Sequence, residues 1–395
     1  MSYRPGPQDD WADWDGPTAP IGEPPVTQVQ ARRRTQPLGY FGAPAPAQTA
    51  ARSPRPVATA GRPRRRRRQL LAVAALVVAL VALVALVIGA NRALAFGSAI
   101  SPQAPLSSQT GFMSGVGRVN VVVLGYGGAG HDGAYLSDSL MVMSLSPSDR
   151  ATTMISIPRD LWVQVPPNSG QYAKLNTAFA DGMANGYDGR PPGQLAGGLE
   201  AAAKVSDVTG LNVPYFMTIN FQGFRELVDA LGGVDIDVPT AFTANYPAND
   251  DPQINAGWKV IHFDKGMQHM NGERAIEYAR ARYVIAPASE GSDFARSARQ
   301  QLLIRAIASR MRSPSAWPGL SGAMDALQKA IYTNLSLADL AAFTLKLDLN
   351  NAAQVGVSTS NVLVNATSGD GQDILLPQNG DWDAIKQYIS SRLKQ

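Results

Sequence analysis

The chain of 395 residues contains no cysteine and only three histidines. Without cysteine it has no disulfide, no thiolate metal site and no cysteine nucleophile. The histidines, His131, His262 and His269, lack the short spacing that zinc sites use. We also find no P-loop and no Ser-His-Asp arrangement. Nothing in the sequence therefore supports a covalent enzyme intermediate.

The net charge of +4 is divided unevenly along the chain. Residues 1–117 hold 13 Lys and Arg against 5 Asp and Glu, whereas residues 118–395 hold 22 against 26. The basic character thus belongs to the N-terminal part. An anion site in the remaining, mildly acidic part requires local clustering of arginine.

Two N-terminal segments differ sharply in composition. Residues 1–68 are rich in Pro, Gly, Ala, Gln and Arg, so they bury too little apolar surface to fold, and we predict a disordered cytoplasmic tail. Leu70–Ala90 is a run of 21 uncharged residues. As a helix rising ~1.5 Å per residue it spans a ~30 Å hydrocarbon core. We predict one transmembrane helix over residues 69–90 rather than a cleaved signal peptide, which would lie nearer the N-terminus.

Arginines set the predicted orientation of this helix. Arg62 and Arg64–Arg68 precede the apolar run, and only Arg92 follows it closely. The positive-inside rule places the N-terminus in the cytoplasm and residues 91–395 outside, in a single-pass protein of the cell membrane. The arginines could also bind nucleic acid, but a topological anchor that touches anionic lipid is simpler. We predict no nucleic-acid partner.

The extracytoplasmic part is predicted to have a stalk and one folded domain. Residues 91–117, rich in Ser, Gly, Pro and Gln, form the stalk, and residues 118–395 the domain. Strands are expected at Val119–Leu124, Ser139–Leu145, Thr152–Ile157, Tyr215–Asn220 and Val234–Val238. Helices are expected at Leu195–Val208, Phe221–Leu231, Arg296–Arg312, Leu337–Leu347 and Trp382–Leu393, and Asn271 is the expected N-cap of a further helix that runs to about Ala279. This alternation predicts an α/β fold, a mixed central sheet flanked by helices on both faces.

Three segments combine Arg with Asp or Gln. In the first, Arg159 follows the end of an apolar strand, where ligands gather in open α/β sheets. In the second, Arg280 and Arg282 are two residues apart, a spacing that shares a face on a strand and not on a helix. If both meet one ligand, the chain should leave its helix near Arg280.

The third segment, Asp293–Gln301, is expected to be helical. Arg296, Arg299 and Gln300 would then lie on one face. Taken singly, Arg299 could be an ordinary exposed or salt-bridged helix residue. Together the segments supply four or five guanidinium groups in a net acidic domain. Because Arg forks bind phosphate bidentately, they predict a polyphosphate ligand.

A carboxylate and two polar residues complete the candidate set. Asp138 opens a strand just after a glycine-rich loop. In phosphate chemistry Mg²⁺ is held by one or two carboxylates with phosphate oxygens and water, so Asp138 is a candidate ligand, or else a turn residue. Lys174 and Asn176 could add one donor each, or be loop residues. The pattern favours direct attack on phosphorus by an acceptor hydroxyl, with Arg and Mg²⁺ neutralising the leaving pyrophosphate.

These segments resemble the LytR–CpsA–Psr family, most strongly over residues 118–312. The resemblance is carried by Asn120–Gly125, Ser137–Ser139, Ser156–Asp160, Lys174–Asn176, Phe221–Pro239, Asn271–Glu273, Tyr278–Arg282 and Asp293–Gln301. It implies a phosphotransferase outside the membrane. Such an enzyme takes a glycopolymer from a polyprenyl pyrophosphate carrier and leaves a phosphodiester on a peptidoglycan hydroxyl.

The resemblance also implies roles for individual residues. The residues that would act on the pyrophosphate are Arg159, Arg280, Arg282, Arg296 and Lys174, and those that would help to bind substrate are Asn176, Arg299 and Gln300. Asp138 would hold Mg²⁺, with Mn²⁺ as the alternative. A hydrophobic pocket would hold the prenyl chain, with Phe224, Leu227 and Val228 as candidate wall residues, although core packing explains each more simply.

Two positions depart from the family pattern. The family usually has Asp where this chain has Gly127, and Arg where it has Leu136. These departures predict a metal site that is weaker or differently built. Our hypothesis is that His131 or Asp132, from the same glycine-rich loop, replaces the missing group, so Asp132 joins Asp138 as a candidate metal ligand.

Two other functions share the same arginines. A non-catalytic binder of lipid-linked glycans would use them to hold pyrophosphate without turnover, and a pyrophosphate hydrolase would use water as acceptor. Direct transcriptional control is not expected, because residues 1–68 show no helix-turn-helix pattern. The transferase remains the leading hypothesis.

Overall fold

The computed structural model describes residues 64–103, 112–113, 117–131, 133–249 and 257–393. It does not describe the side chains of residues 64–77, 81, 84, 85, 293, 317, 318 and 320. Residues 69–395 form one compact unit, and residues 1–68 are a separate unit. The fold below is that of the larger unit.

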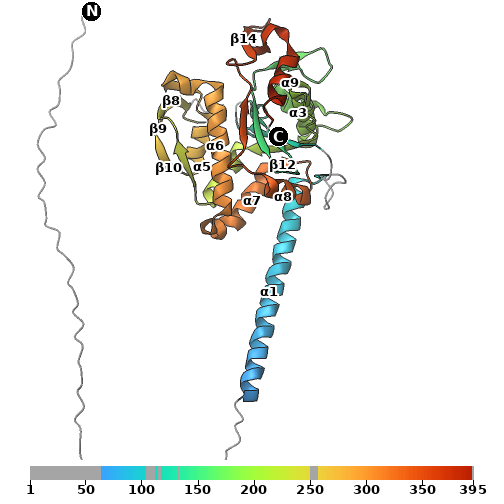
Figure 1. The fold of residues 1–395 in the computed structure, drawn as a ribbon, viewed down its shortest axis with the longest axis vertical. Helices are drawn as coiled ribbons and strands as arrows, with labels where there is room; N and C mark the ends of the chain where they lie inside the picture. Colours follow the sequence, from blue (N-terminus) through green and yellow to red (C-terminus); the bar gives the residue numbers. More distant parts are fainter. Residues whose placement is uncertain (1–63, 104–111, 114–116, 132, 250–256, 394–395) are drawn as a thin grey trace, which may run out of the picture. The chain divides into compact units, whose positions relative to one another are not determined.

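A six-stranded mixed sheet forms the centre of the fold (Figure 1). Its strands follow the order β12-β6-β1-β2-β3-β13. Their bounds are β1 Val119–Tyr126, β2 Ser137–Leu145, β3 Thr152–Ile157, β6 Tyr215–Asn220, β12 Ile331–Thr333 and β13 Ala353–Gly356. β2 is antiparallel to β1 and β3, β12 is antiparallel to β6, β6 is parallel to β1, and β13 is parallel to β3. The predicted α/β architecture is confirmed.

Helices cover both faces of this sheet. They are α2 Thr177–Asn185, α3 Gln194–Thr209 and α9 Trp382–Ser390 on one face, and α6 Asp293–Arg312 and α8 Leu337–Lys346 on the other. On the first face Leu124 and Ile155 belong to one buried cluster with Phe179 of α2. On the second, Met154 shares a cluster with Phe343 of α8. Apolar side chains on both sides of each strand explain the continuous apolar runs of β1 and β3.

A smaller layer of strands lies beside the central sheet. Its elements are α4 Phe221–Ala230, β7 Val234–Val238, β8 Phe242–Pro247, β9 Trp258–Phe263, β10 Gly266–Met270, α5 Gly272–Arg280 and β11 Tyr283–Ala286. β7 pairs with β10, and β8 lies between β9 and β11. Phe242, Phe263 and Tyr278 form the centre of a separate core, with the rings of Phe242 and Phe263 stacked 5.0 Å apart. This layer carries Arg280 and Arg282.

Shorter elements complete the described chain. They are β4 Trp162–Gln164, β5 Tyr172–Lys174, α7 Leu320–Ala330, β14 Leu363–Thr367 and β15 Asp373–Pro377, with the 3-10 helices η1 Ala288–Gly291, η2 Pro314–Gly319 and η3 Gln378–Gly380. The β4–β5 hairpin ends with Lys174. It thereby holds the chain between Arg159 and Asn176.

The N-terminal helix α1 runs from Arg64 to Ile100. It covers the predicted span of residues 69–90 and continues into the predicted stalk, so residues 91–100 are helical, and Ile100 is fully buried. Much of the predicted span has side chains outside the description, as does all of residues 1–63. Among the residues described, no helix combines the length and apolar character needed to cross a membrane. The predicted domain bounds and membrane span stay predictions.

Most expected elements of the folded domain are present. β3, β6 and β7 have the predicted bounds, and the predicted helices begin and end within three residues of the observed ones. Asn271 caps α5, because its side chain accepts a hydrogen bond from the backbone N–H of Arg274 at 2.9 Å. α5 ends at Arg280, where the prediction required the chain to leave the helix. The strands of the smaller layer other than β7, the strands β4, β5, β12, β13, β14 and β15, and helices α2 and α7 were not expected.

Candidate active site

Four strand ends of the central sheet meet at one edge. β1 and β3 run toward this edge and β2 runs away from it, because β2 is antiparallel to both. The register pairs Gly125 with Ser139 and Leu140 with Ile157, so the ends of β1 and β3 flank the start of β2. β6 is parallel to β1 and ends at the same edge with Asn220. The loops that leave these strands are therefore neighbours.

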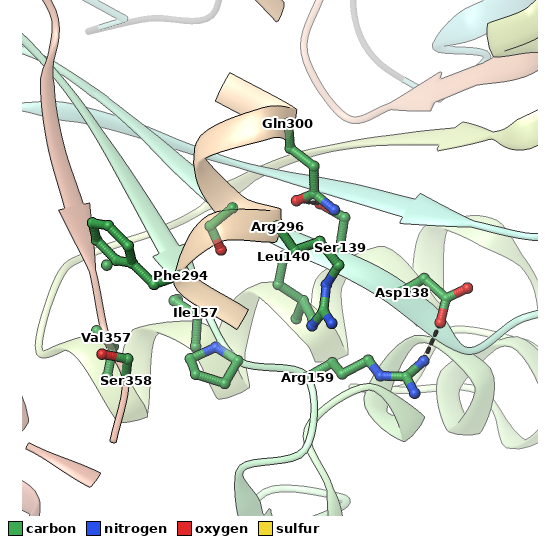
Figure 2. Close-up of a pocket in the computed structure, with 13 residues that line it drawn as sticks. Asp138, Ser139, Leu140, Ile157, Arg159, Phe294, Arg296, Gln300, Val357 and Ser358 are labelled. Carbon is green, nitrogen blue, oxygen red and sulfur yellow. Dashed lines mark hydrogen bonds and ion pairs between the residues drawn. The ribbon is translucent and has the colours of Figure 1, made fainter. Parts of the chain in front are cut away.

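A small pocket opens at this edge between the sheet and α6 (Figure 2). Its walls come from the start of β2, the end of β3, the first turns of α6 and the residues that follow β13. Arg159 and Arg296 line it, together with Asp138 and Gln300. Asp138 is the one carboxylate among the described residues of the lining. The pocket thus joins the first and third predicted segments.

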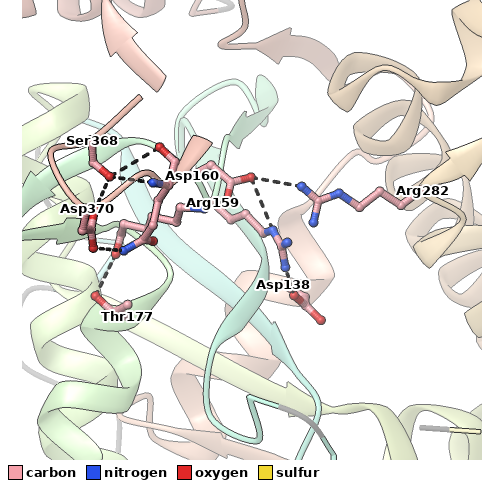
Figure 3. Close-up of polar contacts among 9 residues, drawn as sticks. Asp138, Arg159, Asp160, Thr177, Arg282, Ser368 and Asp370 are labelled. Atoms are coloured by element: carbon pink, nitrogen blue, oxygen red, sulfur yellow. Dashed lines mark hydrogen bonds and ion pairs between the residues drawn. The ribbon is translucent and has the colours of Figure 1, made fainter. Parts of the chain in front are cut away.

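Asp160 links three cationic side chains beside the pocket (Figure 3). Its Oδ1 lies 3.2 Å from Lys174 Nζ, and its Oδ2 lies 3.5 Å from Arg159 Nε and 3.4 Å from Arg282 Nη2. Arg159 also donates through Nη1 to Asp138 Oδ1. The Arg282 side chain is 40% exposed and so remains accessible to a ligand. Among the described residues, these three cations and Arg296 outnumber the carboxylates of Asp138 and Asp160, so their net charge at this edge is positive.

Arg280 is held from three sides at the end of α5. Its Nη1 donates to the hydroxyl of Tyr246 at 3.0 Å, and its Nη2 lies 2.8 Å from His131 Nε2. The guanidinium stacks over the Phe221 ring at 4.2 Å. Such cation–π contacts contribute roughly 0.5–1 kcal/mol at exposed sites. Phe221 follows β6 directly, so Arg280 joins the same edge of the sheet.

Gln300, on α6, connects this helix to the central sheet and to α5. Its Oε1 accepts a hydrogen bond from the Ser139 hydroxyl at 2.9 Å, and its Nε2 donates to the Ala279 carbonyl at 3.5 Å. Arg296 lies one turn earlier on α6, also in the pocket lining. Both residues therefore face the pocket, as their helical spacing predicted.

Arg299 does not share that face. Only 2% of it is exposed, and its guanidinium donates to the carbonyls of Tyr278 and Ala281 at 3.1 and 2.6 Å. It also forms an ion pair with Glu290 at 3.1 Å. Burial lowers the pKa of the Arg299 guanidinium, and Glu290 opposes that shift. The prediction that Arg299 touches substrate is corrected: it ties α6 to α5 and η1 behind the pocket.

Asn176 is also buried. Its side chain is 4% exposed, and its Oδ1 has no hydrogen-bond partner. Its backbone N–H donates to the Arg159 carbonyl at 3.0 Å, and its carbonyl accepts from the Ser137 N–H at 3.0 Å. The burial argues against direct substrate contact, and the backbone bonds position the chain around Arg159. Asp132 lies outside the described residues.

Asp160, Tyr246 and Phe221 were not among the predicted site residues. Asp160 directly follows Arg159, so its position was a usable signal that the prediction did not weigh. Tyr246 had no such signal, because its partner Arg280 is 34 residues away in sequence. The pairing depends on β8 lying against α5, which only the folded chain shows.

The pocket suits a divalent cation only in part. Mg²⁺ beside phosphate needs one or two carboxylates, with phosphate and water supplying the other oxygens. Asp138 is such a carboxylate, next to Arg159 and Arg296. Within the described residues no group of three or more His, Asp or Glu side chains could hold a metal ion. The donor chemistry thus fits one carboxylate ligand from the protein.

A family model, that of the LytR_cpsA_psr family, matches residues 85–390. The chain belongs to this family. The predicted resemblance is therefore confirmed over most of the chain, including both arginine-bearing layers.

Relatives in the family are named as transferases. TagU of Bacillus mycoides (strain KBAB4), a polyisoprenyl-teichoic acid–peptidoglycan teichoic acid transferase, is 28% identical over 281 residues, 70% of this chain and 78% of TagU. TagV of Bacillus subtilis (strain 168), a transferase of the same description, is 30% identical over 204 residues, 51% of this chain and 46% of TagV. The prediction of a transferase is borne out at this level.

Solved structures share the fold. The crystal structure of B. subtilis TagV matches with a TM-score of 0.50 at 22% identity and covers 71% of this chain and 98% of TagV. Protein gbs0355 from Streptococcus agalactiae matches with a TM-score of 0.53 at 23% identity, over 73% of this chain and 91% of gbs0355. At these identities the match supports the architecture alone.

The candidate prenyl-pocket residues pack in the core. Leu227 and Val228 are 4% and 0% exposed and belong to two different apolar clusters, and Phe224 packs against one of them. Core packing, the simpler account of each residue, is confirmed.

Proposed function

We propose that this chain is an extracytoplasmic phosphotransferase that moves a glycopolymer phosphate from a polyprenyl pyrophosphate carrier onto peptidoglycan. One observation carries the proposal. In a member of this family, five cationic side chains from separate elements gather at one sheet edge, where the described residues place the carboxylates of Asp138 and Asp160 among them: Arg159, Lys174, Arg280, Arg282 and Arg296. A pyrophosphate group has the charge and the oxygen geometry that such a cluster binds.

The reaction exchanges one phosphorus–oxygen bond for another. The oxygen of a peptidoglycan hydroxyl attacks the phosphorus that carries the glycan. The bond from that phosphorus to the bridging oxygen breaks, polyprenyl phosphate leaves, and the hydroxyl proton passes to solvent. Negative charge builds on the phosphoryl and leaving oxygens, and preorganised guanidinium groups aimed at those oxygens lower the barrier.

Individual side chains divide this work by position. Arg159 and Arg296 line the pocket and would hold the phosphate that is transferred. Arg280 and Arg282, from the smaller layer, would hold the leaving phosphate. Asp138 would hold Mg²⁺, or Mn²⁺ in its place, and the cation would neutralise charge on the pyrophosphate.

The substrates imply a place at the membrane surface. A polyprenyl carrier stays in the bilayer, so an enzyme acting on its pyrophosphate gains from an anchor beside it. Leu70–Ala90 supplies an uncharged run of suitable length, and Arg64–Arg68 favours a cytoplasmic N-terminus. We therefore propose that residues 69–90 span the membrane and that the folded domain lies outside.

The test is a reconstituted transfer reaction. The full chain in detergent is mixed with Mg²⁺, a short glycan on polyprenyl pyrophosphate and peptidoglycan oligomers, and mass spectrometry follows the glycan–phosphate–peptidoglycan adduct. The expected result is an adduct that Arg159→Ala and Asp138→Ala both lose. The matched controls Arg190→Ala and Asp383→Ala remove an exposed arginine and an exposed aspartate that pair outside the pocket, and should retain activity.

Two other outcomes would contradict the proposal. Release of glycan phosphate without an adduct, across a range of acceptors, would identify a hydrolase. Tight binding of the lipid pyrophosphate with no cleavage would identify a regulator or carrier.

A further inference from the structure

The side chain of His131 fills the space in front of Gly127. A β-carbon built on Gly127 would lie 2.4 Å from His131 Cγ and 2.5 Å from Nδ1, distances that real β-carbons do not reach. The loop turns back to allow this, since the His131 N–H donates to the Gly128 carbonyl at 3.2 Å and Gly128 has a φ of +92°. The His131 ring can therefore occupy this place only because residue 127 is a glycine.

The chemistry of the His131–Arg280 contact fixes the direction of its hydrogen bond. A guanidinium has only donors, so at 2.8 Å the imidazole Nε2 of His131 accepts from Arg280 Nη2. His131 therefore holds one end of the guanidinium as a hydrogen-bond acceptor.

The two ends of the Arg280 guanidinium have different partners. Tyr246 from β8 accepts from Nη1, His131 accepts from Nη2, and the Phe221 ring supports the flat face. The edge of His131 also packs on Phe221, with ring centroids 5.4 Å apart and the planes at 80°. These partners fix the orientation of the guanidinium before any ligand binds. Without them, the long side chain would lose its conformational freedom on binding, and that entropy loss would weaken the affinity.

We propose that His131 is a positioning residue that orients Arg280 toward the pyrophosphate. The proposal rests on the function proposed above and adds a residue to it. His131 does not touch the phosphate. It acts through Arg280, and Gly127 is the position that leaves room for it.

The first arm of the test is structural and needs no ligand. Crystal structures of the wild type and of His131→Ala are compared at Arg280. The expected result is that the guanidinium of the variant rotates away from its wild-type place or loses defined density. An Arg280 that keeps its wild-type position and order in His131→Ala would overturn the proposal.

The second arm measures binding of farnesyl pyrophosphate with Mg²⁺ to the full chain by calorimetry. His131→Ala should weaken binding about tenfold, or about 1.4 kcal/mol, and Arg280→Ala somewhat more. The double variant should be no weaker than Arg280→Ala alone, because both changes remove one coupled contribution. Additive losses would show that His131 acts independently of Arg280 and would overturn the proposal.

Two further variants separate positioning from general damage. Gly127→Ala should displace the intact His131 ring and reproduce the loss, whereas Gly127→Asn with His131→Ala places an amide acceptor in the same space and should restore part of the binding. His262→Ala is the matched control, because His262 is an exposed histidine bonded to Asp264 and Thr243. Thermal melting checks that each variant folds.

The arms also separate this proposal from the function on which it rests. A wild type that does not bind farnesyl pyrophosphate would count against a pyrophosphate site, while disorder of Arg280 in His131→Ala would still support positioning. Tight wild-type binding that His131→Ala leaves unchanged would overturn the role of His131 and leave the transferase standing.

Discussion

Arg296 and Arg299 lie three residues apart on α6, yet their environments are opposite. Arg296 lines the pocket at the sheet edge. Arg299 is 2% exposed, and its guanidinium donates to the carbonyls of Tyr278 and Ala281 and forms an ion pair with Glu290. Both are arginines in one dense motif, and both looked equally suited to bind phosphate. The partners of an arginine, more than its place in a motif, decide whether its charge is available to a ligand.

The largest expected difference between the two arginines is in their contribution to the stability of the fold. Arg299→Ala leaves the partly buried Glu290 carboxylate without its counter-ion and two carbonyls without donors, which costs about 3–5 kcal/mol. Arg296→Ala should change the free energy of unfolding by less than about 0.5 kcal/mol. Urea unfolding measures both. Equal losses of unfolding free energy in the two variants would show that the buried contacts of Arg299 do not stabilise the fold more than those of Arg296.

The converse prediction concerns activity. Arg159→Ala and Arg296→Ala should each lower the transfer rate by roughly 10²–10³-fold while the protein stays folded, because each removes a donor from the developing charge. Arg159→Lys should recover only part of the loss, since an ammonium cannot bind phosphate bidentately. Rates are measured by the adduct assay and folding by melting temperature. A full rate in either alanine variant would remove that arginine from the site.

A buried acidic residue, Glu200, extends the comparison of buried and accessible charged side chains. Glu200 on α3 is fully buried, and its carboxyl group lies beside that of Asp181. Burial, with the neighbouring Asp181 adding to it, raises the pKa of Glu200 from 4.5 to about 8. The folded state therefore keeps a proton that the unfolded state releases.

The sign of the pH dependence follows from that proton. This contribution to stability is complete below about pH 4.5 and is lost as the pH rises to about 8. The loss is at most about 1.4 kcal/mol per pH unit. Unfolding of the wild type and of Glu200→Gln at pH 6 and pH 8 tests this. A wild type whose pH response matches that of Glu200→Gln would show that Glu200 is ionised in the fold.

The smallest expected effect concerns Asp160. Asp160→Asn removes the carboxylate between Arg159, Lys174 and Arg282, so these cations repel one another and their positions loosen. We expect a five- to tenfold lower rate, about 1–1.4 kcal/mol, with tighter nonspecific binding of inorganic pyrophosphate. The same variant should make binding more dependent on salt. An unchanged rate would mean that backbone contacts alone hold the three cations.

Sequence patterns predicted four strands of the central sheet and β7 of the smaller layer, because the signals of these elements are local. The apolar run of β1, the alternation of β7 and the N-cap at Asn271 each depend on neighbours in sequence. Strand β8 alternates in the same way, with Phe242, Ala244 and Tyr246 buried, and the prediction missed this local signal. Strands β9 and β11 gave no such signal. Their exposed residues, such as Val260 and Ile285, break the alternation that marks a half-buried strand, and their pairing joins distant segments.

The sequence predicted which residue types belong to the candidate site, but not the direction and contacts of every side chain. Arg159 lies just after β3, Asp138 at the start of β2 and Arg280 at the end of α5, and sequence periodicity locates such ends. The inward direction of Arg299 depends on which side of α6 packs against α5, and helical spacing alone does not fix that rotation. The contact of His131 with Arg280 spans 149 residues and depends on a glycine-rich turn.

The parallel pairing of β13 with β3 bears on the order in which the chain is completed. Every cationic residue of the site has been made once α6 is finished, but the outer edge of β3 is covered only by residues 353–356. Until then, the strand that leads into Arg159 presents unpaired N–H and C=O groups, which invite pairing with other chains. A chain cut short after α6 would carry all its charged groups on a sheet with an open border, and would be prone to aggregate before it could bind anything.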